Sequence, residues 1–89
     1  MTKSISGYVD VPVEDRERFV AALPDHAHLT NQEPGCHYFR VTPDPNVEGR
    51  YLVEEAFDDE AAYQAHVERT SKTTWANVTR NIKRSYKVS

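Results

Sequence analysis

The sequence has one cysteine, Cys36, and three glycines among its 89 residues. A single cysteine cannot form a disulfide within the chain, and so few glycines leave no glycine-rich loop of the kind that holds nucleotide phosphates. The CxxC pair of zinc and redox sites, the HExxH motif of metalloproteases and the GxSxG turn of serine hydrolases are also absent. We therefore expect a protein that binds no metal and works with no organic cofactor.

Long apolar runs are missing as well. No stretch of about 18 apolar residues is available to span a bilayer. The first residues, MTKSISGYVDV, lack the apolar segment and cleavage site of a secretory signal. We therefore expect a cytoplasmic protein with no membrane partner.

Acidic residues are missing from the last part of the chain. Residues 69–89 carry six Lys or Arg and no Asp or Glu, whereas the whole chain has a net charge of −3. A basic segment can bind nucleic acid or another anion, or it can pair with acidic groups of the same fold or of a partner subunit. Only six charges are involved and the chain as a whole is acidic, which favours pairing, so we expect no nucleic-acid partner.

What the chain does have is enough apolar material for a core. Hydrophobic residues make up 38% of the sequence, and nine side chains are aromatic, five of them Tyr. That composition is too apolar for a disordered chain, and the length predicts one domain over residues 1–89. Domains this small bury a modest fraction of their surface, so dimerisation would help to stabilise the fold.

The first half of the chain predicts a strand and a helix. Residues 5–11 alternate apolar and polar side chains, which is typical of a strand. A helix should begin near Glu14, because several acidic residues there suit the positive end of a helix. Pro24 cannot continue that helix undisturbed, so residues 24–32 are expected to form a second helical stretch that Pro24 begins, before Glu33-Pro34-Gly35 ends it.

The second half predicts a hairpin, a helix and a last strand. Residues 36–42 and 50–57 read as strands joined by a short turn, so they should pair. One face of this hairpin is expected to carry His37, Phe39, Val41, Tyr51, Val53, Glu55 and Phe57. Asp58 or Asp59 should cap a helix that runs to about Thr70, a helical turn should follow at residues 74–79, and residues 81–88 should form the last strand.

The order β-α-β-β-α-β predicts an α+β fold of the ferredoxin-like kind, an antiparallel sheet with helices on one face. The other face would carry the apolar or aromatic side chains of Tyr8, Tyr38, Leu52 and Ala56. Two such faces can cover each other in a symmetric dimer. We therefore expect a homodimer.

Several polar residues are candidates for chemistry. His66 lies on the inward stripe of the second main helix, where it is either a core histidine bonded to a neighbour or a base in a pocket. Tyr63 and Trp75 are expected to be partly core and partly pocket wall. His37 is a candidate ligand contact, although Cys36 beside it should face the other side of the strand.

Other polar residues fit structural roles better. His26 and His28 are two apart on a helix and point to different faces, so they are expected at the surface. Glu55, among apolar and aromatic neighbours, is expected to make a structural hydrogen bond to the backbone or to an arginine.

Two stretches carry a resemblance to a known family. Glu33-Pro-Gly-Cys36 followed by an aromatic strand, and the run from Tyr51 to His66, resemble the antibiotic biosynthesis monooxygenases. The shared pattern is a strand ending in Glu-x-aromatic, an acidic helix start and an Ala-x-x-x-His helix. Its positions are matched here by Glu55, Phe57, Ala62 and His66.

The resemblance implies a dimeric α/β barrel made of two ferredoxin-like sheets. It also implies a cofactor-independent monooxygenase that oxidises small, electron-rich aromatics, such as quinols or anthrones, with O2. The alternative is a barrel of the same fold that binds a small ligand or acts as an isomerase. Haem degradation is not expected, because the histidine ligand of haem-degrading relatives would fall near Thr73 or Thr74.

The resemblance also bears on the site. Tyr63 stands where anthrone-oxidising relatives have a pocket tyrosine, while Val53 and Phe57 replace an asparagine and a tryptophan. The predicted site has His66 as the catalytic base. The predicted substrate-binding residues are Tyr63, Trp75, His37, Phe39, Val53 and Phe57.

Overall fold

The computed structural model describes residues 2–88. Its strands and helices follow the predicted order, with a short 3-10 turn at Val13–Asp15 before the first helix. The elements are β1 (Lys3–Asp10), α1 (Arg16–Asn31), β2 (Cys36–Pro43), β3 (Arg50–Phe57), α2 (Glu60–Thr70), α3 (Thr74–Val78) and β4 (Lys83–Val88).

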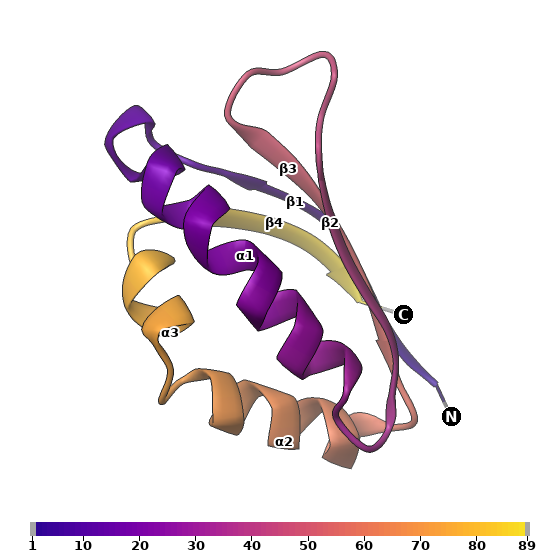
Figure 1. Ribbon diagram of the computed structural model, residues 1–89. Coiled ribbons are helices and arrows are strands. Elements are labelled where there is room, and N and C mark those ends of the chain that lie inside the picture. The colour runs from indigo at the N-terminus through magenta and orange to yellow at the C-terminus, as the bar shows by residue number, and fades with distance from the viewer. Residues whose placement is uncertain (1, 89) are drawn as a thin grey trace.

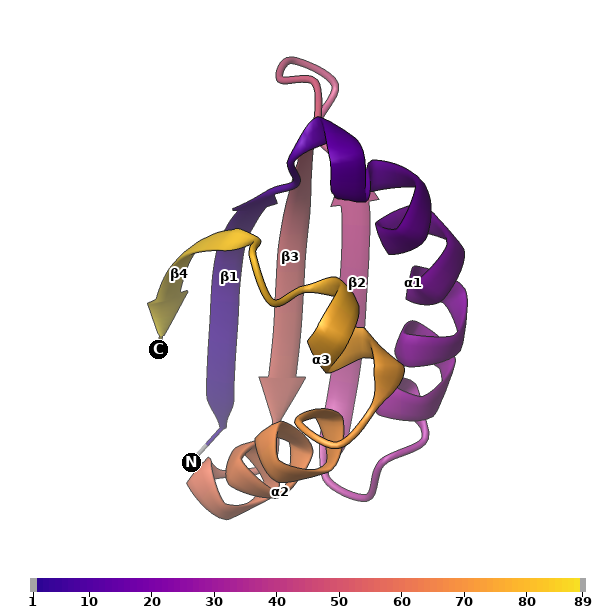
Figure 2. The ribbon, with the colours of Figure 1, turned by 90° about the vertical axis from the view of Figure 1, so that its left-hand side faces the viewer.

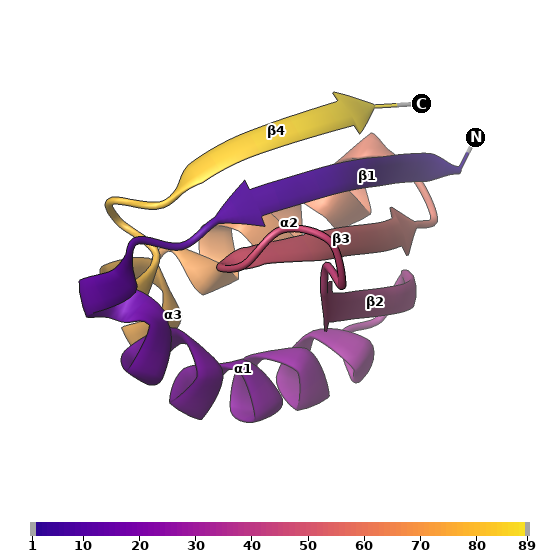
Figure 3. The same cartoon turned by 90° about the horizontal axis from the view of Figure 1, so that it is seen from above.

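The four strands form one antiparallel sheet in the order β2-β3-β1-β4. All helices lie on one face of this sheet, and no element covers the other face within the described residues (Figures 1 and 3). Figure 2 looks onto the helical side, where α1 follows the β2 edge, α2 crosses one end of the sheet and α3 lies between them. The predicted ferredoxin-like α+β fold is confirmed.

The core forms where the alternating strands meet the helices. In β1 the side chains of Ile5 and Val9 are buried and those between them are not, as a sheet with one covered face requires. Phe19 from α1, at 1% exposure, packs in one core cluster with Val9. The other buried members of this cluster are Val11, Val53, Val78 and Ile82.

Helix α1 is continuous through Pro24, so the expected second helical stretch at residues 24–32 is wrong. A proline removes one backbone donor and crowds the carbonyl four residues earlier. Helix α1 nevertheless includes Pro24 and ends only at Asn31. The inward stripe therefore continues from Phe19 to His26 and Thr30, all of them buried. His26, which was expected at the surface, is 5% exposed.

Strand β2 carries a bulge at His37. Cys36 pairs with Phe57 and Tyr38 pairs with Ala56, so His37 has no partner of its own in β3. Because an extra residue in one strand shifts the alternation, Cys36 shares the face of Phe57. The expectation that Cys36 lies on the face of Tyr38 is wrong.

The open face of the sheet combines aromatic and aliphatic side chains with charged ones, among them the ion pairs Arg40–Glu54 and Arg50–Asp10. The guanidinium of Arg50 lies over the ring of Tyr8, with 3.8 Å between Cζ and the ring centroid. The guanidinium of Arg40 lies over the ring of Tyr38 with 4.6 Å between the same two points. Leu52, which pairs with Tyr8 across the sheet, is 38% exposed on this face. None of the helices in residues 2–88 is long and apolar enough to cross a membrane.

Candidate functional site

A cavity of about 60 Å³ lies between the sheet and the helices. Its wall is mostly aromatic and aliphatic, with a few polar groups that come from β3, β4 and the end of α3. The lining residues that bear on chemistry are His26, Phe39, Glu55, Trp75, Arg84 and Tyr86. By size the cavity holds roughly four waters, at about 15 Å³ each, so it does not enclose an aromatic ring.

A wider hollow of about 460 Å³ adjoins this cavity between α2, α3 and β4. The two share the side chains of His26, Trp75, Thr79, Arg84 and Tyr86. Tyr63 and Arg80 line only the hollow. A small aromatic molecule therefore has space in the hollow, with one edge directed at the inner cavity.

His26 forms an aromatic wall of the cavity. Its ring stacks on Trp75 with 4.3 Å between centroids and 7° between planes, and it meets Phe39 edge-on at 5.1 Å. Burial, followed by the positive charges of His66 and Arg69, lowers its pKa to about 3. The imidazole is therefore neutral at physiological pH and packs as an aromatic side chain.

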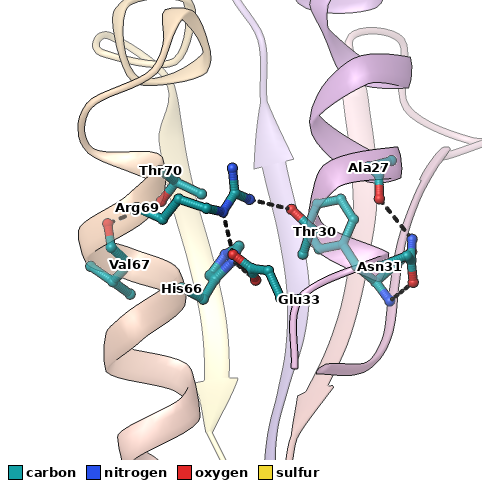
Figure 4. Close-up of polar contacts among 9 residues, drawn as sticks. Ala27, Thr30, Asn31, Glu33, His66, Val67, Arg69 and Thr70 are labelled. Carbon is teal, nitrogen blue, oxygen red and sulfur yellow. Dashed lines mark hydrogen bonds and ion pairs between the residues drawn. The ribbon is translucent and has the colours of Figure 1, made fainter. Parts of the chain in front are cut away.

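His66 is held by a buried polar chain that joins α2 to the turn after α1 (Figure 4). Its Nδ1 lies 2.8 Å from Oε1 of Glu33, whose other oxygen accepts from Arg69, and Arg69 also donates to Thr30 Oγ1 at 3.1 Å. A carboxylate can only accept, so Nδ1 carries the proton and Nε2 has the free lone pair. Burial lowers the pKa of His66 despite the opposing effect of Glu33.

Glu55 points from β3 toward the helices and is 7% exposed. Among residues 2–88 its carboxylate makes no hydrogen bond, so the expected structural bond to the backbone or to an arginine is not observed. Burial raises its pKa to about 7, with a smaller contribution from the charge of Glu33 and an opposing one from Arg84. Near neutral pH this carboxyl is therefore poised between its two protonation states.

Two β4 side chains, those of Arg84 and Tyr86, line the same cavity as Glu55. Arg84 donates to Thr79 Oγ1 at 3.2 Å, and Thr79 in turn donates to the Trp75 carbonyl at 2.7 Å. Desolvation raises the pKa of Tyr86 to about 12. The guanidinium is thus fixed beside the cavity while the phenol stays neutral.

The structure gathers most of the predicted substrate contacts on one side of the sheet. Trp75, Phe39 and Val53 line the cavity, and Tyr63 lines the hollow. Phe57 is fully buried and supports Tyr63 edge-on at 5.6 Å.

The two histidines of the predicted site do not line either space. His66 is surrounded by the rings of Phe57, Tyr63, Phe39 and His26, with centroids 5.0–6.5 Å away. His37 is not brought to the site, because the bulge leaves its ring with Asp58, Nε2 to Oδ1 at 2.6 Å, and its side chain is 42% exposed.

Four residues of the site were not singled out from the sequence for their roles there: His26, Glu55, Arg84 and Tyr86. His26 had a usable signal, since it lies seven residues after Phe19 on a continuous helix stripe. Arg84 and Tyr86 alternate on one face of β4, but nothing in the sequence tells which cavity that face adjoins. Among residues 2–88, no group of three or more His, Cys, Asp or Glu is arranged to hold a metal ion.

Comparison with known proteins gives one family. The family model described as "Antibiotic biosynthesis monooxygenase" matches residues 4–77. No curated protein matches the sequence.

Several solved structures share the fold. A protein of Nitrosomonas europaea assigned to the antibiotic biosynthesis monooxygenases is 20% identical, with a TM-score of 0.82 over 99% of this chain and 86% of that one. A Deinococcus radiodurans protein with the same assignment is 24% identical, with a TM-score of 0.78 over 100% and 88%. SnoaB from Streptomyces nogalater, described as a cofactor-independent oxygenase, is 12% identical, with a TM-score of 0.81 over 99% and 90%.

Proposed function

Because the chain belongs to the antibiotic biosynthesis monooxygenase family, we propose that it oxidises a small, electron-rich aromatic compound with O2 and without a cofactor. Quinols, naphthols and anthrones in their enol form are the substrate class. The observation that carries the proposal is the aromatic cavity and its adjoining hollow, into which a few groups able to move a proton are directed.

The chemistry that such a site must support is modest. A phenolate can pass an electron to O2 without help from a metal or a flavin, so the protein has to promote ionisation and stabilise the anion in a dry pocket. The radical pair then forms a peroxide on the ring carbon. Loss of water leaves a quinone, so that a naphthol and O2 yield one naphthoquinone and one water.

The hollow suits such a ring better than the inner cavity does. At about 460 Å³ it falls within the usual size range of small-ligand sites. Tyr63 and Trp75 offer flat apolar surfaces to a ring, and Phe39 and Val53 form the inner wall. His37 plays no part in this proposal, since its imidazole lies against Asp58.

We also propose that the protein is a cytoplasmic homodimer. The support for the dimer is the sheet face that no helix covers (Figure 1), on which the side chains of Tyr8, Tyr38 and Leu52 lie. In a face-to-face pair these side chains would be buried between the two sheets.

The test is oxygen uptake by the purified protein, freed of metals and flavins, with a panel of anthrones, naphthols and hydroquinones. We expect uptake above the buffer rate with at least one member and a quinone as product. Uptake that appears only after addition of a metal or flavin would contradict the proposal, as would no uptake with any member.

An isomerase function is the second candidate. Glu55, with a pKa near 7, also suits proton transfer between the keto and enol forms of a ligand. Exchange of an anthrone methylene proton with deuterium under argon, with no O2 consumed in air, would favour this alternative.

A further inference from the structure

We propose that Glu55 removes the substrate proton and that Arg84 stabilises the anion that results. The substrate would then be a phenol or an enol whose hydroxyl group points from the hollow toward the inner cavity. This inference rests on the proposed function and adds the identity of the proton acceptor.

Glu55 presents its carboxylate to the cavity. A buried carboxylate is normally held by donors, because burying an unpaired charge is costly. Glu55 is nearly as buried as the core and lines a cavity, and no donor holds its oxygens among residues 2–88. No fully enclosed side-chain oxygen or nitrogen in that part of the chain lacks a hydrogen-bond partner, so the Glu55 oxygens face the open space of the cavity. Both oxygens are therefore free to accept from a ligand.

Arg84 places a cation at the same cavity as Glu55. It lines the cavity with Glu55 and also lines the hollow, yet makes no ion pair with Glu55. Its guanidinium is oriented by Thr79 instead. A base and a separate cation facing one space can take a proton and hold the resulting phenolate at the same time.

The remaining titratable groups do not compete for this role. His26 has a pKa near 3, and Tyr86 has a pKa near 12, so neither is a useful acceptor at neutral pH. His66 has its Nδ1 bound to Glu33 and lines neither space. The charged or titratable groups that act on Glu55, or are acted on by it, are Glu33, Cys36, Tyr63, Arg84 and Tyr86.

The steps balance with O2 as the only oxidant. The substrate O–H bond breaks and its proton goes to a Glu55 oxygen, leaving a phenolate beside Arg84. The phenolate gives one electron to O2, and the radical and superoxide join as a C–O bond at the ring carbon. The later proton transfers go through water in the open hollow. The peroxide takes up the proton that Glu55 has released to this water, the ring carbon loses its proton as the O–O bond breaks, and the departing hydroxide takes up that proton to become water.

The test compares Glu55→Gln with Glu54→Gln. Glu54 precedes Glu55 on β3, but its side chain is exposed on the open face of the sheet, near Arg40. With a naphthol of ordinary acidity we expect Glu55→Gln to lower kcat on the order of 10²-fold and to remove the rise in rate around pH 7. Glu54→Gln keeps the size and polarity of a side chain on the open sheet face, so it should form the native oligomer in sedimentation and turn over the naphthol as the native protein does.

A pre-ionised substrate separates proton removal from structure. A nitro-substituted naphthol that is already a phenolate at pH 8 should be oxidised by Glu55→Gln within a few-fold of the native rate. Equal losses for both substrates would overturn the inference. The inference would also be overturned if His66→Gln lost all activity while Glu55→Gln kept the native rate.

A binding measurement distinguishes failure of this inference from failure of the proposed function. The ¹³C carboxyl signal of Glu55 should titrate near pH 7, and addition of 1-naphthol under argon should shift that titration but not the one of Glu54. If the native protein consumes no O2 yet shows this shift, the oxygenase function is wrong and the proton acceptor is right. A Glu55 titration that 1-naphthol leaves unchanged overturns the inference whatever the oxygen data show.

Discussion

His66 Nδ1 lies 2.8 Å from Glu33 Oε1, and this contact joins helix α2 to the turn that follows α1. Arg69 donates to the other oxygen of Glu33, so one partly buried carboxylate binds two side chains of α2 (Figure 4). The hollow lies along the same helix, and Tyr63 on α2 lines it. The position of the substrate wall therefore depends on this contact.

Loss of the His66 ring should destabilise the fold. His66→Ala removes a buried ring and leaves the partly buried Glu33 with one partner fewer, so we expect the free energy of unfolding to fall by about 1–3 kcal/mol. His37→Ala is the matched control, because the contact of His37 with Asp58 is solvent-exposed and worth at most about 1 kcal/mol. Urea melts of both variants measure the difference, and equal melts would contradict the structural role of His66.

His66→Gln separates positioning from proton transfer. An amide can still donate to Glu33 but cannot take a proton from the substrate. Since Glu55 is our proton acceptor, we expect kcat within about ten-fold of the native value, measured as oxygen uptake at pH 7–8. A loss on the order of 10²-fold with folding intact would instead make His66 the general base, as the sequence alone predicts.

The raised pKa of Glu55 should cost stability at high pH. Its folded pKa is about 7 against a usual value of 4.5, so the folded state binds more protons than the unfolded state between these pH values. Stability from this group is full below pH 4.5 and is lost as the pH rises through 7. Glu55→Gln should therefore be more stable than the native protein at pH 8, by about 1–3 kcal/mol, in urea melts from pH 4 to 8. Glu54→Gln should show no such gain.

His26 should act in the opposite direction. Its folded pKa of about 3 lies below the usual 6.5, so stability from this group is present above pH 6.5 and is lost as the pH falls toward 3. His26→Phe keeps an aromatic ring against Trp75 but cannot be protonated. We expect its stability advantage over the native protein to grow by up to about 1.4 kcal/mol per pH unit on acidification. His28→Phe, exposed on the same helix, should give no such trend in urea melts.

The open sheet face should mediate dimerisation. Leu52→Lys places a charge in the middle of that face, where a face-to-face partner would bury it unpaired. Val20→Lys is the control, because Val20 is exposed on helix α1 away from the sheet. Sedimentation at micromolar concentration should show a dimer for the native protein and the control, and a monomer for Leu52→Lys. A monomer in all three would contradict the dimer.

The fold was more predictable from the sequence than the site was. Alternation in β1 and β3 sets which side chains face the helices, since a strand has a period of two, and Val9 and Val53 are buried as expected. The prediction for helix α1 fails at Pro24, because a proline signals a break that the surrounding packing overrides. His26 was expected at the surface for another reason, because it and His28 point to different faces of a helix, and its place on the buried stripe of Phe19 was missed.

The site depends on relationships between distant segments. The bulge at His37 is a feature of strand pairing and leaves no signature in the residues themselves. Glu55 was expected to find a hydrogen-bond partner. Its oxygens are free because none of the elements around the cavity places a donor within hydrogen-bond distance of them. Such an absence cannot be read from spacing along one strand.

Labelled oxygen tests the proposed monooxygenase function most directly. Purified, metal-free and flavin-free protein would turn over an anthrone or naphthol under ¹⁸O2, with oxygen uptake and the mass of the quinone recorded together. We expect one O2 consumed per quinone formed, one ¹⁸O atom in the product and no hydrogen peroxide released. A quinone that carries no label, or one equivalent of hydrogen peroxide per quinone, would contradict that function.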